Sequence, residues 1–325
     1  MRRNWDIFCR VVDNLGDIGV SWRLARQLVY EYQFEVRLWV DDLAGFARIA
    51  PEIMFDATRQ YVQGVEVCIW QQPFVFDVPA DVVIETFACE LPKAYIVAMA
   101  RQVRQPLWID LEYLSAEGWV PDYHGLPSPH PSFSLVKTFF FPGFVEDTGG
   151  LLREKDLLTE RDRFDSQATR NFFRCYSIPD RQPDEIRISL FCYDSAPLGL
   201  FINQWINSAT PVFLLVPQGN VAEKLCALLG AQQSEIGRVL RCGQLSVLVI
   251  PFLEQTEYDR LLWSCDFNFV RGEDSFVRAQ WANRPFVWQI YQQQEGAHWP
   301  KLDAFLNRYT ARMSVQMTAE VYTLW

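Results

Sequence analysis

Two aspartates lie in a short glycine-containing loop near the start of the chain, within the run Asp13-Asn14-Leu15-Gly16-Asp17-Ile18-Gly19. A strand-length apolar stretch precedes this loop, and an amphipathic stretch typical of a helix follows it. At such a junction, backbone N–H groups and the positive end of the helix dipole can approach a polar ligand. Because carboxylates repel phosphate and attract cations, the loop suits a cationic or proton-losing acceptor better than a dinucleotide. The candidate acceptor loop comprises Asp13, Asn14, Gly16, Asp17 and Gly19.

A second polar loop lies between an apolar strand and a helix in the second half of the chain. Gly272 permits a tight turn, and Asp274 and Ser275 can cap the helix while its backbone N–H groups point toward a diphosphate. Glu273 can accept hydrogen bonds from the vicinal hydroxyls of a sugar, and Arg271 can offset phosphate charge. A capped helix with a surface ion pair would contain the same residues, so local chemistry leaves both interpretations open.

The elements that must position these loops follow an α/β pattern, in which strand-length apolar runs alternate with helix-like segments. The helix after the first loop is expected over residues 20–32, with an apolar face that includes Trp22, Ala25 and Leu28, and with Asp17 placed to cap it. Parallel sheets bind ligands at the carboxyl ends of their strands. Strands are expected at residues 5–12, 36–40, 65–70, 82–86, 107–110 and 136–139, and again at 186–193, 212–216, 245–250, 267–270 and 286–290.

The composition limits the classes of function. A chain of 325 residues, half of them hydrophobic and with 24 Phe and 12 Trp, can bury two large cores. The net charge of -10 argues against nucleic acid as the main partner. We find no signal peptide, no membrane-spanning apolar run and no paired metal-ligand spacing among the eight cysteines, so we expect a cytoplasmic protein with reduced thiols and no metal. Three isolated histidines are interpreted as structural or surface residues, namely His124, His130 and His298.

Four segments together resemble one known family. Residues 13–28 read DNLGDIGVSWRLARQL and residues 271–293 read RGEDSFVRAQWANRPFVWQIYQQ. With Phe191-Cys192-Tyr193 and residues 250–255, they closely resemble the bacterial protein-arginine rhamnosyltransferases that modify elongation factor P. The resemblance implies a GT-B fold, in which two Rossmann-like domains face each other across a cleft. It also implies an inverting, metal-independent transfer of rhamnose from dTDP-β-L-rhamnose to an arginine guanidinium of the factor, which is thereby activated.

A shift in composition sets the domain limits, and the resemblance gives each domain its ligand. An amino-terminal Rossmann-like domain that binds the acceptor is expected at residues 1–150, and a carboxy-terminal Rossmann-like domain that binds the nucleotide sugar at residues 185–325. Between them, residues 151–184 are charged and contain prolines, which is typical of an interdomain connection. The final segment is expected to cross back to the first domain. Chains of this family tend to continue beyond the position of Trp325.

On the acceptor side, the resemblance makes Asp17 the general base, with Asp13 beside it in acceptor binding or loop geometry. A guanidinium has a pKa above about 12, whereas an ordinary carboxylate has a pKa of about 4. The carboxylate therefore cannot deprotonate the guanidinium before it attacks the sugar. Proton loss must therefore accompany formation of the C–N bond. A turn-forming role for Asp13 and a helix-capping role for Asp17 remain alternatives. Residues 110–113 follow an apolar strand on the same side, and we assign them no catalytic role.

On the donor side, the resemblance places Phe191 and Phe252 around the thymine ring, where flat side chains can stack on a base. Without it, a phenylalanine at a strand end is core more often than it is a stacking partner. Glu273 is assigned to the ribose or phosphate region. The remaining donor-binding residues are expected to be Tyr193, Gln255, Arg271, Asp274, Ser275 and Tyr291.

Two alternative functions fit the sequence less well. A nicotinamide-dependent oxidoreductase would use a GxGxxG loop, but Asn14 replaces the first glycine and Asp17 would face the pyrophosphate. A noncatalytic binder of elongation factor P or of a sugar nucleotide would not need both Asp17 and Glu273. Because a folded acceptor is recognised over more than one side chain, we expect the amino-terminal domain of the factor to be the partner and a free arginine to be a poor substrate. Nucleic acid and membrane are not expected as partners.

Overall fold

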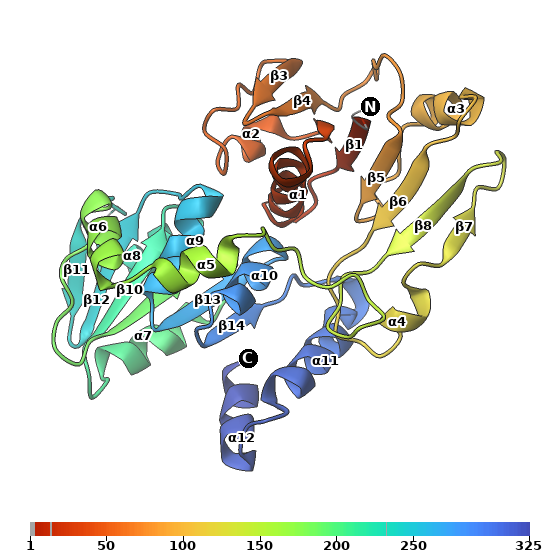
Figure 1. Cartoon of the computed structure of the whole chain (residues 1–325). Coiled ribbons are helices and arrows are strands. Elements are labelled where there is room, and N and C mark those ends of the chain that lie inside the picture. The colour runs from red at the N-terminus through yellow and green to blue at the C-terminus, as the bar shows by residue number, and fades with distance from the viewer. Residues whose placement is uncertain (1–3, 14, 232) are drawn as a thin grey trace. The chain divides into compact units, whose positions relative to one another are not determined.

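The computed structural model describes residues 4–13, 15–231 and 233–325 (Figure 1). The chain divides into two compact units. The first contains the residues up to Lys155 together with Gln292–Thr323, and the second contains Asp156–Tyr291 with Leu324–Trp325. No helix among the described residues has the length and apolar character needed to cross a lipid bilayer.

The described part of the first unit contains an eight-stranded sheet with the order β3-β4-β2-β1-β5-β6-β8-β7. Its parallel strands follow the order 3-2-1-4-5-6 that is typical of Rossmann-like folds, and β3 and β7 are antiparallel edge strands. The predicted strands of this half are confirmed, whereas β3 and β7 were not predicted. The strands are β1 (Asn4–Cys9), β2 (Glu35–Val40), β3 (Arg59–Val62), β4 (Val65–Ile69), β5 (Val82–Thr86), β6 (Leu107–Leu111), β7 (Pro127–Pro129) and β8 (Val136–Phe140).

Helix α1 (Gly16–Tyr32) contacts β1, β2 and β4. Its buried face includes the predicted residues Trp22, Ala25 and Leu28. On β1, the buried Phe8 ring stacks on Trp39 with centroids 5.8 Å apart, which joins two strands of the core. The other helices of this unit are α2 (Leu43–Phe46), α3 (Lys93–Arg101), α4 (Val120–Tyr123), the short η1 (Gln294–Gly296), α11 (His298–Thr310) and α12 (Val315–Leu324), whose last residue groups with the second unit.

The second unit contains a six-stranded sheet with the order β11-β12-β10-β9-β13-β14. Its parallel strands have the order 3-2-1-4-5, and the unpredicted β11 is an antiparallel edge strand. The strands are β9 (Ile186–Leu190), β10 (Val212–Pro217), β11 (Val239–Cys242), β12 (Leu245–Ile250), β13 (Phe267–Arg271) and β14 (Phe286–Gln289). The helices are α5 (Leu157–Arg163), α6 (Ser166–Cys175), α7 (Leu198–Ile206), α8 (Asn220–Leu228), α9 (Gln255–Ser264) and α10 (Asp274–Trp281).

Successive residues of β10 support two hydrophobic layers, one on each face of the second sheet. Leu214 and Val216 belong to one buried cluster, and Phe213 and Leu215 belong to the other. Phe172 and Phe173 of α6 pack in the second of these clusters. The helices α5 and α6, which lie within the segment predicted to connect the domains, therefore form part of the second unit.

Candidate active site

The acceptor loop lies at the carboxyl end of β1. The strand ends at Cys9, earlier than predicted, because the following backbone turns and the Val12 and Asp13 N–H groups donate to Asp17 Oδ2, each at 2.9 Å. Helix α1 begins at Gly16, so Asp17 lies in its first turn. The expectation that Asp17 caps this helix is wrong, because its carboxylate binds the preceding loop and α1 has no side-chain cap.

The Asp17 side chain is fully buried, and hydrogen bonds to both of its carboxylate oxygens fix its orientation. Oδ2 accepts the two backbone N–H groups, and Oδ1 accepts a hydrogen bond of 2.9 Å from the Tyr113 hydroxyl. Asp13 is also buried, and its carbonyl accepts the Gly16 N–H at 2.7 Å. The Gly19 N–H continues the helix by donating to Leu15 at 2.9 Å. These contacts bring the predicted acceptor residues together, except Asn14, which lies outside the described residues.

The loops after β5 and β6 complete the surroundings of Asp17. The Phe87 ring stacks on Tyr113 with centroids 4.2 Å apart and an angle of 11° between the ring planes. The Lys301 ammonium, on α11, lies 5.2 Å from the centroid of the Tyr113 ring. Burial, and then the nearby Asp110 carboxylate, raise the pKa of Glu112 to about 7. From the sequence, residues 110–113 were placed after an apolar strand on the acceptor side and were given no catalytic role.

A buried ion cluster lies beside this region on β5, β6 and β8. The Lys137 ammonium lies 2.5 Å from an Asp110 carboxylate oxygen and 3.4 Å from one of Glu85. Burial raises the pKa of Glu85, although the charge of Lys137 opposes that shift. One cation thus faces two buried carboxylates.

The donor residues gather around one guanidinium in the second unit. Arg271 Cζ lies 4.5 Å from the centroid of Phe191 and 4.8 Å from that of Tyr193, and Nη1 donates to the Cys192 carbonyl at 3.2 Å. Phe252 lies 6.1 Å from Phe191, and Tyr291 lies 5.9 Å from Tyr193, between ring centroids. The arrangement places aromatic faces and a cation at the carboxyl ends of β9 and β13.

The loop between β13 and α10 is held by hydrogen bonds to its own backbone. Ser275 Oγ accepts from the Arg271 N–H at 3.1 Å and donates to the Arg271 carbonyl. Asp274 Oδ2 accepts from Gln255 Nε2 at 3.1 Å, and Glu273 is buried. The predicted side-chain caps by Asp274 and Ser275 are wrong, because these side chains bind Gln255 and Arg271 and α10 has no side-chain cap.

Two donor-side residues were missed by sequence reasoning. Tyr258 lies one helical turn after Gln255 on α9, and its ring centroid is 5.8 Å from that of Phe191. Burial raises the pKa of its hydroxyl. Gln289 accepts the Tyr193 N–H through Oε1 at 2.7 Å. The turn spacing from Gln255 could have indicated Tyr258, whereas nothing in the sequence links Gln289 with Tyr193.

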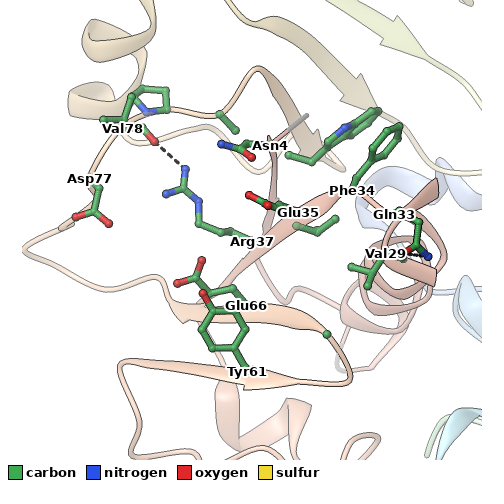
Figure 2. A pocket seen from close by; sticks show the side chains of 15 residues that line it. Asn4, Val29, Gln33, Phe34, Glu35, Arg37, Tyr61, Glu66, Asp77 and Val78 are labelled. Carbon is green, nitrogen blue, oxygen red and sulfur yellow. Dashed lines mark hydrogen bonds between the residues drawn. The ribbon is translucent and has the colours of Figure 1, made fainter. Parts of the chain in front are cut away.

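A cavity of about 570 Å³ lies at the amino ends of the central strands of the first sheet, opposite the acceptor loop. Its lining includes Asn4 of β1 and Glu35 of β2. Figure 2 shows Arg37 in this cavity, with its guanidinium donating to the Val78 carbonyl. The same guanidinium donates to both carboxylate oxygens of the buried Asp6, at 2.6 and 2.7 Å. We attribute these contacts to support of the fold. Among the described residues, no group of histidine, cysteine and carboxylate side chains could hold a metal ion.

Two Rossmann-like units in one chain, one with an acidic acceptor loop and the other with aromatic rings beside a diphosphate-suited loop, are typical of GT-B glycosyltransferases. A family model described as Elongation-Factor P (EF-P) rhamnosyltransferase EarP matches residues 5–325. The chain therefore belongs to the EarP family. The family match gives the oxidoreductase interpretation no support.

Relatives agree with this assignment along the chain. A protein-arginine rhamnosyltransferase of Pseudomonas putida is 51% identical over 327 residues, covering 100% of this chain and 86% of the relative. A protein-arginine rhamnosyltransferase of Shewanella oneidensis is 42% identical, covering 94% of this chain and 80% of the relative. A solved structure that concerns EarP-mediated arginine glycosylation of translation elongation factor EF-P matches with a TM-score of 0.66 and 38% identity, covering 100% of this chain and 83% of that one.

Proposed function

We propose that this protein transfers rhamnose from dTDP-β-L-rhamnose to an arginine side chain of elongation factor P, with inversion at the anomeric carbon. The orientation of the buried Asp17 carboxylate carries the proposal. Its Oδ2 is occupied by two backbone donors and its Oδ1 by one hydroxyl. A carboxylate oxygen can accept about two hydrogen bonds. The described residues supply one to Oδ1, so this oxygen can accept one more donor or a proton.

The reaction that we propose uses this capacity at the moment of bond formation. An arginine nitrogen attacks the anomeric carbon, and the bond from that carbon to the diphosphate oxygen breaks. The attacked guanidinium becomes more acidic as the C–N bond forms, so Asp17 can accept its proton in the same step. The nucleotide dTDP leaves as the other product.

The donor half would be held by the second unit. Phe191 and Phe252 would stack on thymine, and Tyr193, Arg271 and the start of α10 would bind the diphosphate. A guanidinium and N–H groups can stabilise a leaving diphosphate without a metal ion, and we propose metal-independent catalysis. Glu273, Gln255 and Tyr291 would bind the remaining parts of the nucleotide sugar.

For the acceptor, we propose recognition of the folded amino-terminal domain of elongation factor P in the cytoplasm. The chain carries a net charge of -10, so long-range attraction contributes little to association with an acidic partner. Local shape and the carboxylates of the first unit must then provide most of the specificity.

The deciding experiment compares wild type with Asp17→Asn by intact mass of elongation factor P after incubation with dTDP-β-L-rhamnose. We expect at least about a thousandfold slower transfer, because asparagine cannot accept the proton. Affinity for thymidine diphosphate, measured by calorimetry, should stay the same because the donor residues lie in the second unit. Asp122→Asn, at an exposed site, is the matched control. Unchanged turnover in Asp17→Asn would remove Asp17 from the mechanism.

A further inference from the structure

The Tyr113 hydroxyl donates a hydrogen bond to Asp17, the residue that we propose as the proton acceptor. We propose that Tyr113 is a positioning residue that fixes the Asp17 carboxylate, and this inference rests on the proposed function. The two side chains are 96 residues apart in sequence, and the hydroxyl donates to Oδ1 at 2.9 Å.

The hydrogen bond selects the acceptor site on the carboxylate. Oδ2 already receives the Val12 and Asp13 N–H groups, so the orientation of the carboxylate depends on what binds Oδ1. The Tyr113 hydroxyl occupies one position on Oδ1. An incoming proton must then take the other position on the same oxygen, which restricts the direction from which the acceptor nitrogen can approach.

The Tyr113 ring is itself held in place. Phe87 stacks on it at 4.2 Å, and the Phe87 N–H donates to the Leu111 carbonyl at 2.7 Å. Phe87 and Ala88 have φ angles of 55° and 50°, in the left-handed region that costs non-glycine residues energy. Strain of this kind persists where the surrounding structure fixes the backbone, and it is common beside active sites. The loop after β5 thus presents a rigid platform to Tyr113.

Charged groups around the contact strengthen it. A cation near a phenol stabilises the phenolate and makes the hydroxyl a better donor, and Lys301 lies 5.2 Å from the ring centroid. The Cys9 thiol, on β1, also interacts with the charge of Asp17. Burial raises the pKa of Cys9, and the charge of Asp17 contributes, so the thiol stays neutral.

The test replaces Tyr113 by Phe, which keeps the ring stack and removes the hydroxyl. We expect kcat to fall about 10- to 100-fold, the range for a hydrogen bond to a charged group, with KM for both substrates unchanged within about twofold. Tyr123→Phe, at an exposed tyrosine of the same unit, should match wild type.

A wild-type kcat in Tyr113→Phe would overturn this inference while leaving the proposed function intact. Wild-type enzyme that fails to modify elongation factor P would overturn both. Phe87→Leu provides a second variant, because it loosens the platform but keeps the hydroxyl. We expect a smaller loss of kcat than in Tyr113→Phe, again with KM unchanged, and a wild-type kcat there would count against the platform. Thermal melting of each variant checks that the fold is retained.

Discussion

Two carboxyl groups of the first unit have contrasting surroundings. Asp17 is fully buried and its carboxylate accepts three hydrogen bonds. Glu112 is half-buried near Asp110, and its pKa rises from an ordinary 4.5 to about 7. Near neutral pH, a large fraction of Glu112 therefore carries a proton.

The raised pKa of Glu112 predicts a pH-dependent stability difference. Folding favours the protonated form, so the stabilising contribution is complete below pH 4.5 and is lost as the pH rises to about 7. Glu112→Gln mimics the neutral form. The free energy of unfolding of the variant should match that of wild type at about pH 5. At about pH 8 it should be higher by about 1 kcal/mol, a value reduced because solvent screens the half-buried group. Urea unfolding at both pH values measures the difference, and equal gains at both would contradict it.

At the residue scale, sequence identified the groups that lie close together in the chain. Asp13 and Asp17 could be found because they flank glycine in one loop. Tyr113 could not be linked with Asp17, because that contact depends on the order of β1, β5 and β6 in the sheet. The same reason hid the bond between Gln289 and Tyr193. Local sequence carries no information on which strand ends are neighbours.

At the element scale, the loop between β13 and α10 depends on one backbone conformation. Gly272 has a φ of 63°, in the left-handed region, and its carbonyl accepts the Trp288 indole N–H at 2.9 Å. The turn allows Ser275 to bond back to Arg271. The start of α10 is thereby held beside the rings of Phe191 and Tyr193 that contact Arg271.

Gly272→Ala should therefore weaken both stability and donor binding. A left-handed conformation costs alanine about 1 kcal/mol more than glycine, and relaxation of the loop should reduce affinity for thymidine diphosphate severalfold. Denaturant unfolding and calorimetry measure the two effects. Gly199→Ala is the matched control in the same unit, because this residue lies on α7 with open space around its Cα and an ordinary φ. Equal behaviour of the two variants would show that the turn is not required.

The elements that sequence missed share a physical cause. Parallel strands are buried on both faces and appear as continuous apolar runs, so their positions were predictable. The strands β3, β7 and β11 pair on one side only and expose side chains such as Arg59 and Tyr61. Strand β7 even contains Pro127 and Pro129, which are tolerated only at a sheet edge. Edge strands of this kind lack the apolar signal on which strand prediction depends.

At the scale of the whole molecule, each unit has its own core and its own set of candidate site residues. Aromatic packing around Phe8 and Trp39 supports the first unit. In the second, Arg187 is fully buried and donates to Glu185 at 2.6 Å and to the Pro179 carbonyl at 2.6 Å. The described donor-site residues belong to the second unit alone. Binding of the nucleotide can therefore be tested separately from transfer.

Thymidine diphosphate alone should slow hydrogen exchange in the second unit, at residues 191–193, 252–255 and 271–275, and leave residues 12–17 unaffected. Ligand at about 100 times its dissociation constant should stabilise the second unit by about 2.7 kcal/mol. Phe252→Ala should weaken binding at least about tenfold, because stacking on a base contributes about 1–3 kcal/mol. Asp17→Asn should keep the wild-type protection pattern. If protection appeared only in the first unit, or if Phe252→Ala bound as tightly as wild type, the donor site would have to lie elsewhere.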